Sequence, residues 1–224
     1  MIIVFDAYGT LWDIGRIETT CREIVGPSFS RPLLDLWRQK QLEYAFLRTV
    51  MGRYQSFSSI TEDALAYALA KLQLSIGLSG RTRLQNAWLQ PEPFPDAIPM
   101  LKTLSQWSRL ILSNGDPDML TQGVRAAGMS SLIDATISVN EVQCYKPHPS
   151  TYQIVVDRYH VAPNDVYFVS SNGWDVMGAS HFGFCTVWVN RQGQPLEVLG
   201  ATPTYVVTDL ASLPTTIPPL PAAK

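Results

Sequence analysis

The chain has 224 residues, of which 46% are hydrophobic and only 16% are charged. This length fits one large domain, or one domain carrying an insertion, with enough apolar residues for a buried core. A formal charge of −2 provides no basic excess to neutralise a phosphate backbone, so we expect no nucleic-acid partner. No apolar run approaches the roughly 18 residues that span a bilayer, so we expect no membrane insertion.

The start of the chain and its cysteines indicate a cytoplasmic protein. The apolar stretch Met1–Phe5 is interrupted by Asp6 and has no basic region before it, which argues against a secretory signal. Cys21, Cys144 and Cys185 are odd in number and far apart, without the spacing of a disulfide framework or a zinc site. We therefore expect reduced thiols and no bound metal.

Short apolar segments and helical patterns alternate along most of the chain. Five segments rich in β-branched or aromatic residues predict buried strands, at 2–5, 110–112, 166–169, 186–189 and 205–207. Four helical patterns lie between them, at 96–104, 117–127, 150–159 and 175–181. This alternation predicts an α/β fold, a doubly wound Rossmann-like parallel sheet.

Residues 14–91 break the alternation, because they contain helical patterns without a convincing strand. The predicted helices are amphipathic and cover 32–51, 59–72 and 81–88, the second beginning at a capping box, Ser59–Glu62. We interpret 14–91 as an inserted all-helical lid, called the cap below, on a core formed by 1–13 and 92–213. The remaining residues, 214–224, include four prolines and predict an extended tail.

Polar side chains follow the ends of three predicted strands. Asp6, Ser113–Asn114 and Ser170–Asp175 each come directly after a strand, and Lys146 lies in a loop before a helix. The carboxyl ends of parallel strands meet at one edge of a sheet, so these groups are expected to converge there. One such residue alone is usually a helix cap, and we expect Asp116 and Asp118 to cap the following helix. Together, the others predict a functional site.

Four of these segments match known motifs. Phe5–Leu11, Leu112–Gly115, Tyr145–Pro147 and Ser170–Asp175 resemble, in order, the four motifs of the haloacid dehalogenase superfamily. Within it, the cap segment Leu36–Tyr44 resembles that of the L-2-haloacid dehalogenases, the type II family. The resemblance implies hydrolysis of L-2-haloalkanoic acids to D-2-hydroxy acids and halide, with no metal or other cofactor, and by analogy a homodimer.

Two positions argue against the more common phosphatases of the superfamily. Such phosphatases carry an aspartate two residues after the nucleophile, where this chain has Tyr8, and an acidic pair for Mg²⁺ where it has Ser171–Asn172. A halide leaves without a proton, so a dehalogenase does not need that aspartate. The alternatives are a Mg²⁺-dependent phosphatase and a non-enzymatic binding protein on the same fold.

The resemblance also implies a role for individual residues. Asp6 is the expected nucleophile, attacking C2 of the substrate with inversion to give an ester that water then hydrolyses. The other expected catalytic residues are Thr10, Arg38, Ser113, Lys146, Ser170, Asn172 and Asp175. The residues expected to bind the small 2-haloacid anion are Tyr8, Gln39, Leu42, Phe57, Asn114, Tyr152 and Trp174. The departing halide is expected to contact Arg38, Asn114 and Trp174.

Overall fold

The core is built on a six-stranded parallel sheet. The computed structural model describes residues 2–218, and its strand order is β5-β4-β1-β6-β7-β8, with every neighbouring pair parallel. The central strands Ile2–Phe5 and Val166–Ser170 are buried along their whole length, and Ser108–Ser113 is buried except at Ser108, with the predicted apolar segment 110–112 inside it. The strands are β1 (Ile2–Phe5), β4 (Ser108–Ser113), β5 (Ala135–Ser138), β6 (Val166–Ser170), β7 (Cys185–Val189) and β8 (Tyr205–Val207).

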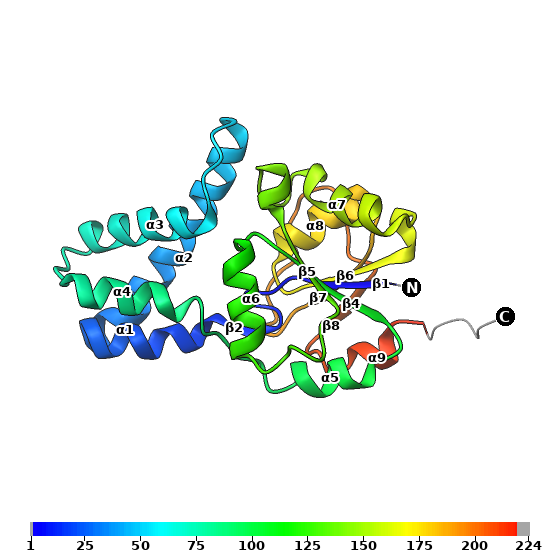
Figure 1. Cartoon of the computed structure of the whole chain (residues 1–224), viewed down its shortest axis with the longest axis horizontal. Coiled ribbons are helices and arrows are strands. Elements are labelled where there is room, and N and C mark those ends of the chain that lie inside the picture. The colour runs from blue at the N-terminus through cyan, green and yellow to red at the C-terminus, as the bar shows by residue number, and fades with distance from the viewer. Residues whose placement is uncertain (1, 219–224) are drawn as a thin grey trace.

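Helices cover both faces of this sheet, which makes the fold a doubly wound Rossmann-like α/β structure. In Figure 1, α7 and α8 lie on one face, and α5 and α9 lie on the other. The core helices are α5 (Ala97–Thr103), α6 (Pro117–Ala126), α7 (Pro149–Tyr159), α8 (Gly173–Phe182) and α9 (Leu213–Thr216). Short 3-10 helices occupy Ile14–Arg16, Val139–Val142 and Pro163–Asp165.

The cap is a separate group of helices beside the sheet (Figure 1). It consists of α1 (Ile17–Val25), α2 (Pro27–Val50), α3 (Phe57–Lys71) and α4 (Leu78–Ala87). The chain enters and leaves it through two short antiparallel strands, β2 (Trp12–Asp13) and β3 (Glu92–Pro93). The helical cap is as expected, and its boundaries at residues 14 and 91 stay a prediction. Within residues 2–218, every helix is too short or too polar to cross a membrane.

Three cap helices begin earlier than the sequence predicted, among them α4, which begins at Leu78 and not at residue 81, and helix α1 was not predicted. Helix α2 starts with Pro27 in its first turn and continues through Pro32, where the prediction began. Helix α3 is capped by Ser56, whose side chain accepts a hydrogen bond from the Ser59 amide at 3.3 Å. Ser56 offers the same capping chemistry as Ser59 one turn earlier, so Ser59 lies inside the helix.

Other differences concern the edges of the core. Strand β5 was not predicted, because Ala135–Ser138 is a short, half-polar strand at the edge of the sheet. The predicted extended tail begins instead as helix α9, with Leu213 and Ile217 buried against the core. The last residues of that tail, 219–224, lie outside the described part of the chain.

Candidate active site

The site begins at the carboxyl end of β1, where the sheet changes its direction of winding between β1 and β6. Asp6 follows β1 directly, and its amide donates to the Val169 carbonyl at 2.9 Å, which continues the parallel ladder. The chain then turns back sharply at Gly9, whose φ of +88° favours glycine. This turn directs the Asp6 carboxylate into the molecule, where the residue is only 5% exposed.

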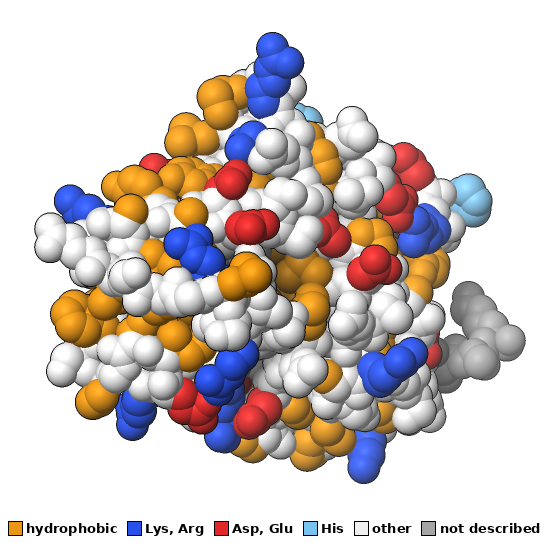
Figure 2. Space-filling model, turned by 60° about the vertical axis from the view of Figure 1, so that its left-hand side comes forward, with side chains coloured by type: hydrophobic (Ala, Val, Ile, Leu, Met, Phe, Trp, Pro, Cys, Tyr) orange, Lys and Arg blue, Asp and Glu red, His pale blue; other side chains and the backbone are white. Residues whose placement is uncertain are grey.

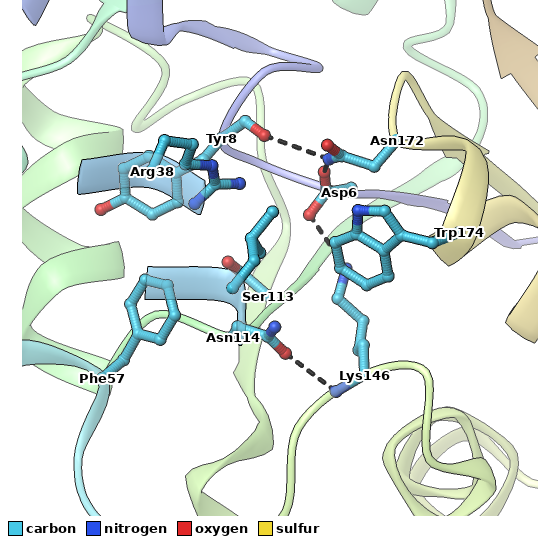
Figure 3. Close-up of a pocket in the computed structure, with 10 residues that line it drawn as sticks. Asp6, Tyr8, Arg38, Phe57, Ser113, Asn114, Lys146, Asn172 and Trp174 are labelled. Carbon is cyan, nitrogen blue, oxygen red and sulfur yellow. Dashed lines mark hydrogen bonds and ion pairs between the residues drawn. The ribbon is translucent and has the colours of Figure 1, made fainter. Parts of the chain in front are cut away.

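Four side chains donate hydrogen bonds to the Asp6 carboxylate. The Lys146 ammonium contacts Oδ1 at 2.9 Å. Oδ2 accepts from Asn172 Nδ2 at 2.7 Å, Thr10 Oγ1 at 3.1 Å and Ser170 Oγ at 3.4 Å. Three separate segments, around residues 6–10, 146 and 170–172, therefore meet at one carboxylate, as the strand ends predicted, and Figure 3 shows Asn172 and Lys146 beside Asp6.

Lys146 joins two carboxylates in the protein interior. Its Nζ donates to Asp6 Oδ1, to Asp175 Oδ2 at 2.6 Å and to the Leu112 carbonyl at 3.0 Å, which uses all three ammonium protons. Burial lowers the pKa of Lys146, but the charges of Asp175 and Asp6 outweigh this effect and raise it above its ordinary value. Lys146 is therefore one cation shared by two buried carboxylates.

Asp175 is the second carboxylate that contacts Lys146. Burial raises the pKa of Asp175 to about 6, although the Lys146 charge acts in the opposite direction. Tyr152 donates its hydroxyl proton to Asp175 Oδ1 at 2.8 Å. Gly178 permits this contact, because a Cβ atom there would lie 2.7 Å from the Tyr152 hydroxyl and 2.4 Å from Pro147 Cβ.

A small cavity lies in front of these groups, between the core and the cap (Figure 3). Its volume is about 250 Å³ including its open mouth. The core and two cap helices both contribute to its wall, which is formed by Asp6, Tyr8, Arg38, Leu42, Phe57, Ser113, Asn114, Lys146, Asn172 and Trp174. The loop after β4 is held in place because the Lys146 amide donates to Asn114 Oδ1 at 3.0 Å.

Arg38 brings a positive charge to the cap side of the cavity. Its Nη1 donates to Gln41 Oε1 at 2.6 Å, and its guanidinium lies over the Trp88 ring, 5.6 Å from the ring centroid. Neither neighbour carries a negative charge. Burial lowers the pKa of Arg38 from its ordinary value, while the charge of Asp6 acts to raise it. An arginine this basic remains protonated, so it is a cation with room for an anionic ligand.

Tyr8 occupies the position at which the related phosphatases have an acid. Its hydroxyl donates to the Trp88 carbonyl at 2.9 Å, at the end of the cap. Burial is the main cause that raises the Tyr8 pKa well above its ordinary value. Tyr8 thus shapes the cavity and holds the cap, and its proton is committed to a main-chain acceptor.

The structure places two expected substrate-binding residues away from the cavity. Gln39 is exposed, because it follows Arg38 directly on α2 and successive helical residues point about 100° apart. Tyr152 is buried behind Lys146, with its hydroxyl on Asp175. Among the expected catalytic residues, Thr10, Ser170 and Asp175 also lie outside the cavity wall and contact Asp6 or Lys146 instead.

Two residues were given no place in the site by the sequence. Gln41 is fully buried against Arg38, three residues along α2, and this helical spacing was a signal that could have identified it. Asp116 accepts hydrogen bonds from the Phe57 and Ser58 amides at 2.9 and 2.8 Å, so it caps α3 of the cap. It does not cap its own helix α6 with its side chain, which corrects the expectation.

Comparisons with known proteins agree with this geometry. Residues 1–183 match the family model described as haloacid dehalogenase-like hydrolase. The chain is 41% identical over 213 residues to (S)-2-haloacid dehalogenase 1 of Pseudomonas sp. (strain CBS-3), covering 94% of this chain and 93% of that protein. The chain belongs to the L-2-haloacid dehalogenase family of the haloacid dehalogenase superfamily.

Two further relatives come from Xanthobacter autotrophicus. Its (S)-2-haloacid dehalogenase is 44% identical over 192 residues, which cover 86% of this chain and 76% of that protein. The solved structure of L-2-haloacid dehalogenase from that organism, with chloropropionic acid covalently bound, is 39% identical and has a TM-score of 0.91, over 96% of this chain and 98% of the other. The whole fold, cap included, is therefore that of the L-2-haloacid dehalogenases.

Proposed function

We propose that this protein hydrolyses short L-2-haloalkanoic acids to D-2-hydroxy acids and halide, with inversion at C2. The observation that carries the proposal is Asp6, a buried carboxylate paired with Lys146 at 2.9 Å, in the wall of a cavity that Arg38 also lines. A structure of a family member with chloropropionic acid covalently bound supports an ester intermediate here. The protein is a hydrolase acting on carbon–halide bonds.

In the first step, an Asp6 oxygen attacks C2 while the bond between C2 and the halogen breaks, and the electron pair leaves with the halide. The main obstacle is the approach of two carboxylates, which repel by about 4 kcal/mol at 4 Å when the effective dielectric is near 20. Lys146 and Arg38 are the cations that offset this repulsion. Arg38, Asn114 and Trp174 receive the halide, because donors and a ring edge suit a large anion.

In the second step, water attacks the Asp6 carboxyl carbon, and the bond between that carbon and the ester oxygen attached to C2 breaks. One proton of the water goes to that leaving oxygen, and the other is released as the Asp6 carboxylate forms again. The D-2-hydroxy acid therefore leaves with an oxygen that belonged to Asp6. Ser170 and Asn172 position the water, and Thr10 and Ser113 orient Asp6 and the substrate carboxylate. Asp175, with its raised pKa, assists removal of the proton from water.

We also propose that the reaction needs no metal. The amide nitrogen of Asn172 faces Asp6 at 2.7 Å, and an N–H donor cannot be a metal ligand in that orientation. Lys146 already bridges the two buried carboxylates, Asp6 and Asp175. A phosphatase with this sequence would have Tyr8 in place of its acid and Ser171–Asn172 in place of its acidic pair. A protein that only binds a ligand would not need a lysine buried between two carboxylates.

The experiment that tests the function is chloride release from L-2-chloropropionate in excess chelator. We expect turnover unaffected by EDTA and a D-2-hydroxy acid as the product. Phosphate release that depends on Mg²⁺, with no chloride release, would identify a phosphatase instead. Binding of the haloacid without release of either anion would identify a binding protein.

We propose further that the protein is a cytoplasmic homodimer. Its free thiols, Cys21, Cys144 and Cys185, suit a reducing compartment. Apolar side chains gather on the cap surface (Figure 2), and the exposed end of α2 carries Val50 and Met51. Such a surface favours association. Light scattering after gel filtration would give twice the monomer mass, and a monomer mass at micromolar concentration would contradict the proposal.

A further inference from the structure

The cap side of the cavity is connected to the core by a continuous chain of hydrogen bonds. Arg38 Nη1 donates to Gln41 Oε1 at 2.6 Å, and Gln41 Nε2 donates to Thr61 Oγ1 at 2.6 Å. The Thr61 hydroxyl donates to the Phe57 carbonyl at 2.7 Å. The Ser58 amide, which belongs to the same peptide group as that carbonyl, donates to Asp116 Oδ2 of the core at 2.8 Å. The chain therefore starts at the cation in the cavity wall and ends two residues after Asn114.

The direction of this chain is fixed by chemistry. A guanidinium has only donors, so it requires the oxygen of the Gln41 amide, and the nitrogen of that amide must then find an acceptor. Thr61 provides the acceptor, and its own hydroxyl donates a hydrogen bond to the Phe57 carbonyl in the first turn of α3. Gln41 and Thr61 are both buried, so a break in the chain would leave a polar group without a partner or water.

Asp116 is unusual because it serves a helix that is distant in sequence. It stands at the start of α6, where its carboxylate could cap its own helix, yet both oxygens accept from α3 amides, Phe57 and Ser58. A negative charge at a helix N-terminus with two amide donors is a strong contact. This contact fixes the first turn of α3, and with it the Phe57 ring in the cavity wall.

Neighbouring contacts join the same cap segment to the core. The Tyr145 amide donates to Thr49 Oγ1 at 2.9 Å, and the Tyr145 ring stacks on Tyr54 with centroids 5.2 Å apart. Asn140 Nδ2 donates to the Tyr54 hydroxyl at 3.1 Å. Asp116 supplies the charged contact in this group, and the hydrogen-bond chain from Arg38 ends at it.

We propose that Asp116 and Gln41 are positioning residues for Arg38, so that the cation reaches its place over the cavity only when α3 is docked on the core. Neither residue touches the cavity. The inference rests on the proposed function insofar as Arg38 receives the halide. Closure of the cap and assembly of the halide site are then one event, because the same hydrogen bonds accomplish both.

The test compares Asp116→Asn and Gln41→Met with a matched control, Asp118→Asn. Asp118 is an exposed aspartate in the same first turn of α6. Bromide is the probe: its affinity is measured from the rise in melting temperature that it causes at constant ionic strength, and from its inhibition of chloride release. We expect bromide affinity to fall about 3- to 10-fold in each of the two variants, the effect of a lost buried hydrogen bond, and to stay unchanged in the control.

A purely structural role would lower the melting temperature without changing bromide affinity, and that result overturns the proposal. A protein that carries both Asp116→Asn and Gln41→Met provides a second test. If both residues act through one chain, its bromide affinity matches that of the weaker single variant, whereas multiplied effects would mean independent roles and overturn the chain. A wild-type protein that binds bromide but releases no chloride would contradict only the proposed function. The melting temperatures measured with bromide would still test whether Asp116 and Gln41 position Arg38.

Discussion

The core half and the cap half of the active site hold their charges in different ways. In the core, Lys146 lies within 2.9 Å of one carboxylate and 2.6 Å of another, and all three groups are buried. In the cap, Arg38 contacts a neutral amide and an aromatic ring. Each core charge lies beside a charge of opposite sign before any ligand enters, while the charge of Arg38 has no such partner and is available to a ligand.

This difference indicates that the core and the cap contribute to different parts of the reaction. A buried network of paired charges resists rearrangement and keeps a nucleophile in one position. An available cation on a separate group of helices binds an anion and is brought to it by contacts between the two parts. Changes in the core are therefore expected to affect the chemical steps, and changes in the cap to affect recognition of the anions.

The largest effect is expected from Asp6→Asn. The neutral amide lacks the nucleophilic oxygen and leaves Lys146 with one carboxylate, so we expect turnover to fall by about 10⁴-fold or more. Chloride release from L-2-chloropropionate is the measurement. Asp157→Asn, on the exposed side of α7, is the control and should retain wild-type turnover. Substantial release by Asp6→Asn would mean that water attacks the substrate directly.

A smaller loss is expected from Arg38→Lys. A lysine ammonium cannot keep the planar contact over Trp88 and also bond to Gln41, so the charge is displaced from the cavity. We expect kcat/KM to fall about 100-fold, equivalent to about 2.7 kcal/mol. Arg31→Lys on the same helix, an exposed arginine paired with Asp35, is the matched control. Equal losses of kcat/KM in both variants would show that the loss does not depend on the position of Arg38 at the cavity.

The smallest effect is expected from Tyr152→Phe, and it takes the form of a changed pH profile. The hydrogen bond from Tyr152 stabilises ionised Asp175 and lowers its pKa, so its removal should raise that pKa above its present value of about 6. Activity that needs the ionised form is lost as pH falls through this pKa. The acid limb of kcat should therefore move to higher pH, with little change at alkaline pH.

Profiles measured from about pH 5 to about pH 9 would show this shift. Tyr159→Phe, on the same helix α7, is the control and should leave the acid limb in place. An acid limb that does not move in Tyr152→Phe would mean that Asp175 does not set it.

The sequence predicted five of the six strands of the sheet, and the polar residues at their ends, because both depend on local rules. Buried parallel strands are short apolar segments, and their carboxyl ends meet at one edge, so Asp6, Lys146 and Asp175 could be brought together without coordinates. Contacts across the cap boundary follow no local rule. Asp116 looked like a cap for the helix that follows it, because nothing in its neighbours indicates a partner 59 residues earlier.

Burial on a helix explains the other differences. Gln39 and Gln41 are the same residue type on the same helix, and only the packing of α2 against α3 shows that Gln41 faces Thr61. Likewise Tyr152 reaches Asp175 rather than the cavity because Gly178 allows α8 to approach α7 closely. The motifs identified which residues take part, and tertiary packing decided which of them touch the cavity.

The pairing of β2 with β3 has a consequence for protein engineering. Trp12 lies opposite Pro93 and Asp13 opposite Glu92, so the chain leaves the core and returns to it at neighbouring points. The entire helical insertion therefore takes the place of a hairpin turn between β2 and β3. A short turn joining Asp13 to Glu92 should therefore preserve the parallel sheet, and a helical insertion from another dehalogenase should be exchangeable at the same two points.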